Sequence, residues 1–370
     1  MAIKTILIVP AAGIRNDALE RPIISRLTAA RRYLSPASGY DAEIQFYGDI
    51  PAILGAERTF VLGGFLPHLH AARVPAHAPY PSCHGVPPIT AVRAAALETV
   101  LSAVDAVLVS TRAGGAGERA IRAARKRDIP VVLLDFPDHW ELYGAPDARA
   151  RLAGSFQAGR DFDLLFMKDL PRGEQTDAVL PLAPSPVRPS SYVLPTALKS
   201  SDIFFSGRTR TECQDDRPEV VDLIRGAFKK ARIIEHDVKR QSFTLIQDYW
   251  TYLAEARMAL SPSGKSWDSF RHAEVGLAPL TALIAPKPYI ETTGPALEDG
   301  RNAILYDIEF RGGRFHLKNG AELVEKIRSY LARPQAIESL ARAWARDVRA
   351  GHTILARSRY ILNEMERVFA

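Results

Sequence analysis

The chain of 370 residues is longer than one compact core usually holds, and 47% of its residues are apolar, so the sequence predicts a globular protein of two domains. Its formal charge of +6 suits an acidic ligand, an anionic membrane surface or a nucleic acid, without choosing among them. With Cys83 and Cys213 as its only cysteines, the chain has no disulfide framework and fits a reducing compartment.

The first apolar run, at residues 5–9, is too short for a signal peptide. No uncharged apolar segment approaches the ~20 residues that a membrane span needs. We therefore expect a cytoplasmic protein that associates at most peripherally with the inner face of a membrane.

In the N-terminal half, short apolar runs alternate with helical segments. The runs predict buried parallel strands at residues 5–9, 43–47, 59–62, 106–110, 130–135 and 163–167. Helices are expected at residues 91–104, capped by Thr90, and at residues 117–127, after two glycines. This alternation is typical of a doubly wound α/β domain.

Residues 180–195 contain five prolines and are expected to form an extended connection between domains, because proline does not continue a helix. A second α/β series follows, with a helix that begins at Asp216 and has Pro218 in its first turn. The remaining elements expected there are strands at 203–205, 232–235, 258–260, 280–284 and 302–306, and helices at 247–257, 321–331 and 335–369.

Residues 258–280 form the stretch with the most chemical character. An apolar strand ends at Leu260, a loop containing Ser263 and Gly264 interrupts it, and a helical segment follows. That segment carries Phe270, Ala273 and Leu277 on one predicted apolar face.

Arg271 and Glu274 lie together on another face of this helix. A strand, a loop of small residues and a helix start together present backbone N–H groups to a phosphate. Arg271 adds a bidentate contact to that phosphate, and Glu274 accepts hydrogen bonds from ribose hydroxyls.

Two other interpretations of this stretch remain open. Gly264-Lys265-Ser266 matches the end of a phosphate-binding P-loop, although alanine occupies position 259, where the first glycine belongs. The stretch also fits an ordinary strand, loop and helix in an α/β core without a ligand.

The stretch resembles the donor-binding motif of GT-B nucleotide-sugar glycosyltransferases, in the exostosin-like and spore-coat-type branch. The resemblance rests on Ser-Pro-Ser-Gly264, on Ser269-Phe-Arg271-His-Ala-Glu274 and on Pro279 before a strand, and it extends from Asp202 to the end of the chain. It covers the N-terminal half only weakly.

The resemblance implies two Rossmann-like domains facing a cleft, with a C-terminal helix that returns to the N-terminal domain. It implies a nucleotide-sugar co-substrate such as a UDP- or GDP-sugar, no metal and no other cofactor. Retaining members carry two glutamates eight positions apart, whereas position 266 here is serine, so an inverting reaction is slightly favoured.

On this basis we expect an acceptor domain over residues 1–182 and a proline-rich linker over residues 183–200. A donor domain would cover residues 201–345, and a terminal helix over residues 346–370 would pack against the acceptor domain.

The expected donor site gathers residues at the carboxyl ends of the C-terminal strands, where open α/β sheets bind ligands. Arg208 and Lys265 are candidates for holding the diphosphate, although both are equally compatible with solvated loop charges. The candidate donor-binding residues are Gly207, Arg208, Ser263, Gly264, Lys265, Ser266, Arg271 and Glu274.

A sugar hydroxyl that attacks an anomeric carbon needs a general base, for which histidine or a carboxylate is suited. Asp138 and His139 follow a strong N-terminal strand and are the first candidates, with Asp17 in the first loop behind them. An aspartate at a strand end is also a common cap, and a lone histidine is often structural.

The N-terminal loops at residues 15–32 and 67–93 are rich in arginine and histidine, which suits an anionic acceptor. The spacing of His68, His70, His77, Cys83 and His84 matches no zinc pattern. A cell-envelope glycan or a lipid-linked saccharide is the first choice of acceptor, and a modified base in DNA is the alternative. A nucleotide-sugar epimerase or hydrolase, and a non-catalytic sugar-nucleotide binding module, remain as rival functions.

Overall fold

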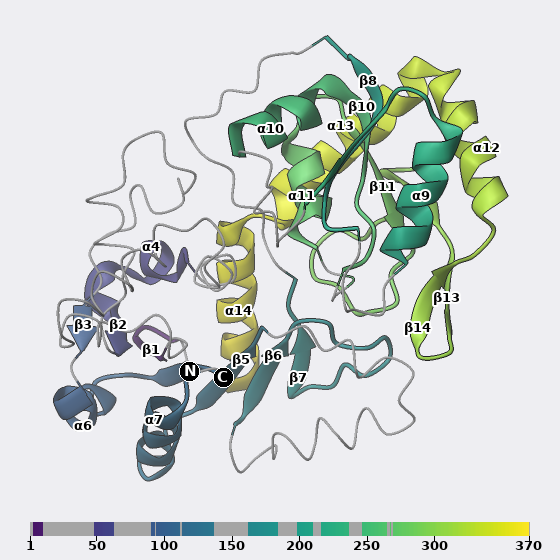
Figure 1. Cartoon of the computed structure of the whole chain (residues 1–370). Helices are drawn as coiled ribbons and strands as arrows, with labels where there is room; N and C mark the ends of the chain where they lie inside the picture. The colour runs from purple at the N-terminus through teal and green to yellow at the C-terminus, as the bar shows by residue number, and fades with distance from the viewer. Residues whose placement is uncertain are drawn as a thin grey trace, which may run out of the picture.

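The structure is a computed structural model, and Figure 1 shows its two sheets and the helices around them. It describes residues 3–9, 48–62, 90–92, 94–111, 113–136, 162–183, 198–209, 216–236, 246–264, 267 and 269–369.

The N-terminal domain is built on a parallel sheet whose described strands lie in the order β3-β2-β1-β4-β5-β6-β7. Its strands are apolar because helices cover both faces. Alternate residues of β1 point to opposite cores: Ile6 and Ile8 to one, Leu7 and Val9 to the other. The strands are β1 (Ile6–Val9), β2 (Thr59–Leu62), β3 (Thr90–Val92), β4 (Ala106–Ser110), β5 (Val131–Asp135), β6 (Leu164–Met167) and β7 (Val179–Pro181).

Short helices and one long helix cover this sheet. One face packs against α4 (Ile50–Leu54) and α14 (Ile354–Phe369), and the other against α6 (Leu97–Leu101) and α7 (Gly115–Arg125). Single helical turns, η2 (Ala56–Arg58) and η4 (Ala94–Ala96), precede β2 and α6.

The C-terminal domain repeats the plan with a parallel sheet in the order β12-β11-β10-β8-β9. Helices α10, α11 and part of α13 cover one face, and α9, α12 and the rest of α13 cover the other. The strands are β8 (Ser201–Gly207), β9 (Ala231–Glu235), β10 (Ala256–Leu260), β11 (Ala282–Pro286) and β12 (Ala303–Tyr306). The helices are α9 (Arg217–Ala227), α10 (Ile246–Glu255), α11 (Phe270–Leu277), α12 (Gly320–Leu331) and α13 (Pro334–Gly351).

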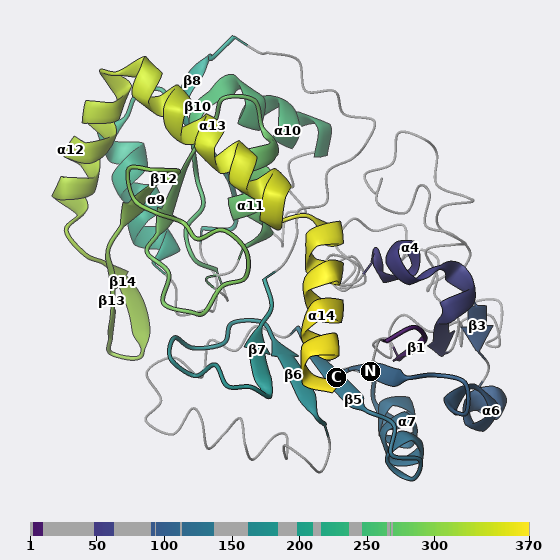
Figure 2. The same cartoon turned by 180° about the vertical axis from the view of Figure 1, so that it is seen from behind.

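The chain crosses back to the N-terminal domain between α13 and α14, as the two opposite views in Figures 1 and 2 show. At this crossing the buried Arg357 guanidinium donates to His352 Nδ1 at 2.7 Å, and His352 also bonds Pro295 O at 2.9 Å. Ser358 Oγ then accepts a hydrogen bond from Asp49 N at 3.2 Å. The predicted return of a C-terminal helix is therefore confirmed, and both chain ends lie at the N-terminal sheet.

A second contact between the domains is made by the segment that follows β11. Its Ile290 forms an isolated antiparallel bridge with Pro171 of the N-terminal domain, and Glu291 N donates to Leu170 O at 2.8 Å. Farther along, Ala183 N donates to the Thr293 hydroxyl at 3.0 Å. These hydrogen bonds fix the carboxyl edges of the two sheets relative to each other.

The structure corrects the N-terminal helix predicted at residues 91–104. Thr90 begins strand β3, which pairs with β2, and only Leu97–Leu101 are α-helical after one turn of Ala94–Ala96. The helix predicted at 117–127 is α7, which begins and ends two residues earlier.

Three further predictions in the C-terminal half were wrong in detail. The helix predicted at 335–369 is two helices, which meet at His352 and Thr353, and the helix predicted at 247–257 ends at Glu255. On α11 the predicted apolar face is wrong at Phe270, which is 49% exposed; the buried side includes Val275 instead. The hairpin of β13 (Ile308–Arg311) and β14 (Arg314–Leu317) was not predicted.

The strand expected at 43–47 and most of the proline-rich connection lie outside the described residues. Of the helices that the structure does describe, none is both long enough and apolar enough to span a bilayer.

Candidate active site

The candidate site lies at the carboxyl edge of the C-terminal sheet, where β8, β9 and β10 end side by side. The predicted strand, loop and helix are present: β10 ends at Leu260, residues 261–264 leave the sheet, and α11 begins after Ser269. The Ser269 hydroxyl caps α11 by accepting from Arg271 N at 3.3 Å. Ser261 Oγ bonds His272 Nδ1 at 2.7 Å and so ties the loop to the helix.

Arg271 is the cation at the centre of this edge. Its Nη2 donates to Ser206 O at 2.6 Å, and its guanidinium lies over the Phe205 ring at 5.2 Å from the centroid. A Cβ at Gly207 would stand 3.2 Å from Nη2, so glycine is the residue that lets the guanidinium approach the end of β8. Gly207 and Arg271, both candidate donor-binding residues, lie next to each other.

Glu274 lies one turn along α11 and pairs with a residue that sequence reasoning missed. Its Oε2 accepts a hydrogen bond from the Tyr249 hydroxyl of α10 at 2.7 Å. Burial raises the pKa of Glu274, while the Tyr249 hydrogen bond and the Arg271 charge act in the opposite direction. Burial and the neighbouring Glu274 also raise the pKa of Tyr249 well above its usual value. The carboxyl is therefore positioned before any ligand binds.

His236, just past β9, is a second residue that the sequence did not reveal. Its Nε2 lies 2.8 Å from Ser206 Oγ, and its backbone N donates to Gly207 O at 2.9 Å. Burial lowers the pKa of His236, and the positive charges of Arg271 and Arg208 lower it further. Ser206 therefore contacts both side chains: its hydroxyl bonds the His236 imidazole, and its carbonyl oxygen accepts from the Arg271 guanidinium.

Arg217 connects the two loops that flank the site. From the start of α9, its Nε donates to Ser263 O at 3.1 Å and its Nη1 to Arg208 O at 3.0 Å. Ser263 is buried and the Arg208 side chain is exposed. The loops after β8 and β10, which carry the predicted Arg208, Ser263 and Gly264, are therefore joined.

A buried carboxyl, Asp216, lies at the start of α9 next to Arg217. Asp216 accepts a hydrogen bond from the Tyr306 hydroxyl at 2.5 Å. Burial raises the pKa of Asp216, and the hydrogen bond from Tyr306 opposes that effect. The only sequence signal for these residues was the helix start at Asp216, because their partners are distant in the chain.

Five predicted site residues lie outside the described residues: Lys265, Ser266, Asp17, Asp138 and His139. The strand that leads to Asp138 and His139 is described, and it ends on a polar pair. Asp135, at the end of β5, accepts a hydrogen bond from the Thr111 hydroxyl at 2.6 Å. The described part of the chain holds no cluster of three or more His, Cys, Asp and Glu side chains suited to a metal.

Comparisons with known proteins agree with this geometry. Residues 215–363 match the family model described as glycosyl transferase-like. HepE from Anabaena, solved in complex with UDP-glucose, superposes with a TM-score of 0.55 at 10% identity, covering 98% of this chain and 99% of that one. Sucrose-phosphate synthase from Thermosynechococcus elongatus gives 0.50 at 10% identity, covering 99% of each chain. No curated protein sequence matches the chain.

The structural similarity shows that the chain has the GT-B fold along its whole length, and its C-terminal half is similar to the glycosyl transferase-like family.

Proposed function

We propose that the protein transfers a sugar from a nucleotide-sugar donor, bound at the carboxyl edge of the C-terminal sheet, to a cell-envelope glycan or lipid-linked saccharide. The acceptor domain would cover residues 1–182, the linker 183–200, the donor domain 201–345, and the returning helix 346–370. The donor would be a UDP- or GDP-sugar, and the protein would act without a metal in the cytoplasm.

One observation carries the proposal: Arg271 and Glu274 lie on the same face of a helix whose start follows the Ser263–Gly264 loop, next to the glycine end of β8. A guanidinium there neutralises a diphosphate, and a pre-positioned carboxylate accepts hydrogen bonds from ribose hydroxyls. The family match across these residues and the UDP-glucose complex of HepE support the same assignment.

The reaction we propose is a direct displacement with inversion. An acceptor hydroxyl oxygen bonds to the anomeric carbon while the bond from that carbon to the diphosphate oxygen breaks. Asp138, His139 or Asp17 takes the hydroxyl proton, and the departing charge is held by Arg271 with Arg208 and Lys265. Gly207, Ser263, Gly264 and Ser266 would contribute the backbone and hydroxyl groups around the diphosphate.

Calorimetry with UDP, GDP, ADP and the matching nucleosides tests the donor site. Arg271→Ala should weaken binding of the preferred diphosphate by about 1–3 kcal/mol and leave the nucleoside nearly unchanged, because its contact is with charge. Arg342→Ala, on an exposed part of α13, is the matched control. Normal diphosphate affinity in Arg271→Ala would move the site away from α11.

Product analysis with the preferred nucleotide-sugar tests the transfer step. We expect the sugar to appear on an extracted envelope glycan or lipid-linked saccharide, with the anomeric configuration inverted. Turnover of the nucleotide-sugar without any added acceptor would instead indicate an epimerase or hydrolase. Nucleotide binding without any turnover would indicate a binding module.

A further inference from the structure

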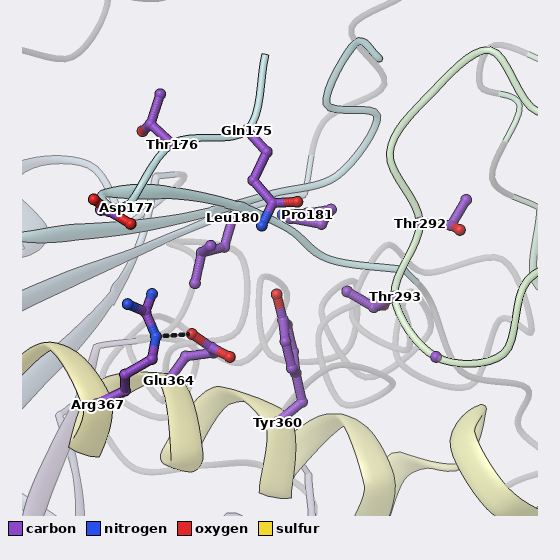
Figure 3. Close-up of a pocket in the computed structure, with 11 residues that line it drawn as sticks. Gln175, Thr176, Asp177, Leu180, Pro181, Thr292, Thr293, Tyr360, Glu364 and Arg367 are labelled. Atoms are coloured by element: carbon purple, nitrogen blue, oxygen red, sulfur yellow. Dashed lines mark hydrogen bonds and ion pairs between the residues drawn. The ribbon is translucent and has the colours of Figure 1, made fainter. Parts of the chain in front are cut away.

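A cavity of about 780 Å³ lies at the junction of the two domains, away from the donor edge described above. Its size falls within the range of about 300–1,000 Å³ that is usual for small-molecule sites. Figure 3 shows its three walls: β7 with the turn before it, the segment after β11, and α14. The lining residues that matter below are Gln175, Asp177, Pro181, Thr292, Tyr360 and Glu364.

The apolar part of the lining centres on the Tyr360 ring. Leu180 and Pro181 are buried on β7, and the Tyr360 ring rises from α14 toward them (Figure 3). The ring is held in place by an edge-to-face contact with Phe166 at 5.6 Å. Surfaces of this kind pack against the C–H faces of a sugar ring, whose edges remain polar.

The polar part of the lining offers hydroxyl, amide and carboxylate groups. Thr292 and Thr293 come from the C-terminal domain, Gln175 and Asp177 from the N-terminal domain, and Glu364 from α14. A carboxylate has two oxygens, and an amide has an oxygen and a nitrogen. Each group can therefore hydrogen-bond two adjacent hydroxyls at once. The Tyr360 hydroxyl adds a group that points into the cavity.

The charge of the lining argues against an anionic ligand. Among the described lining residues Arg367 is the single cation, and it pairs with Glu364 at 2.7 Å, so its charge is already matched. Asp177 adds a further negative charge. A diphosphate or an acidic sugar would meet a net negative charge on these residues, whereas a neutral polyhydroxylated ligand would avoid that repulsion.

We propose that this cavity binds a neutral saccharide segment, as a second glycan site apart from the donor edge. The proposal rests on the proposed function in one respect: the segment would belong to the acceptor glycan, distant from the hydroxyl that receives the sugar. Because both domains line the cavity, a saccharide bound there favours the arrangement in which both walls contact it.

The test is saturation-transfer NMR on the full chain with four neutral tetrasaccharides: maltotetraose, cellotetraose, chitotetraose and mannotetraose. The variants are Glu364→Gln and Gln175→Ala, which alter one wall each. The control is Glu366→Gln, an exposed glutamate on the same helix that does not line the cavity. UDP binding is measured in every variant by calorimetry.

We expect at least one tetrasaccharide to bind the wild type and Glu366→Gln equally. Its affinity should fall by roughly 2- to 10-fold in each cavity variant, the effect of losing one hydrogen bond. UDP affinity should be the same in all proteins. Absence of binding by all four probes, or equal binding in all variants, would overturn the proposal. Tetrasaccharide binding without UDP binding would count against the donor site and leave this cavity supported.

Discussion

Burial favours the protonated form of Glu274, whereas the proposed ligand contact needs its carboxylate. The folded protein holds its carboxyl in a buried position that raises its pKa above the ordinary value of 4.5. The folded state therefore binds this proton more tightly than the unfolded chain does. The stability that the proton provides is lost as pH rises from 4.5 through the raised pKa. A ligand that needs the carboxylate therefore binds at a cost in stability.

Glu274→Gln should therefore give a protein that gains stability relative to wild type as pH rises above 4.5, yet binds nucleotide poorly. Urea unfolding at several pH values from 4.5 to about 8 measures the difference between the two free energies of unfolding. Glu366→Gln, an exposed carboxyl on α14, should follow the wild type throughout. A difference that does not change with pH would show that burial of Glu274 is not the cause.

His236 provides a second proton-linked prediction at the scale of one residue. Burial and the charges of Arg271 and Arg208 hold its pKa below the ordinary 6.5. A bound diphosphate would offset those charges and raise that pKa, so binding near pH 6 should take up protons.

Calorimetry of UDP in two buffers with different heats of ionisation measures this proton uptake. His236→Gln should lower the proton uptake, because glutamine does not titrate, and leave only the contribution of the UDP phosphate. An unchanged buffer dependence in His236→Gln would assign the proton to another group.

At the scale of elements, the contact between α11 and α13 positions the site helix. Gly276 is where these helices approach, since a Cβ there would lie 2.5 Å from Val348 Cγ2 and 3.1 Å from Trp344 Cδ1. The Trp344 indole also donates to His272 O at 2.6 Å. The orientation of α11, and so of Arg271, depends on this packing.

Gly276→Ala should destabilise the protein by about 1–3 kcal/mol, because the added methyl group overpacks this contact. Gly226→Ala in α9 is the matched control: no atom lies within 4 Å of its Cβ, and it should stabilise by about 0.4–1 kcal/mol. Thermal unfolding of both variants decides the comparison. Equal stability of the two would mean that α11 and α13 adjust freely.

The sequence predicted the central strands well because buried parallel strands are continuous apolar runs. It failed where distant pairing prevailed over local propensity. Thr90–Val92 form a strand because they pair with Phe60–Leu62, which no local pattern shows. The end of α13 is a second example, because Gly351 approaches the distant Pro295 so closely that a Cβ would lie 2.2 Å from it.

The candidate site divides in the same way. Arg271 and Glu274 could be proposed from the sequence because they belong to one contiguous motif. Gly207 could be proposed because it ends a predicted strand of the same sheet. Tyr249 and His236 could not, because each meets the site through a side chain from a different element. Asp17, Asp138, His139, Lys265 and Ser266 remain predictions.

At the scale of the whole molecule, α14 completes the core of the domain that begins the chain. Its Ile361, Leu362 and Met365 are buried among residues of β1, β4, β5 and β6. The N-terminal domain therefore depends on residues from the opposite end of the sequence.

Met365→Ala should destabilise the N-terminal domain by about 2–5 kcal/mol, the usual effect of a cavity at a fully buried site. Hydrogen exchange should show reduced protection in β1 and β4, while the fluorescence transition of Trp250 and Trp344 in the C-terminal domain stays in place. Leu355→Ala, 36% exposed on the same helix, should change little. Loss of both domains together in Met365→Ala would show that they unfold as one unit.

The return of α14 also reverses the order in which the domains can be completed on the ribosome. The strands of the N-terminal sheet are synthesised first, but α14, which covers one face of that sheet together with α4, follows only after the C-terminal domain. The C-terminal sheet and its helices α9 to α13 all emerge within that interval. The domain that is synthesised first therefore finishes folding last, and the apolar surface that α14 covers is a natural substrate for chaperones until then.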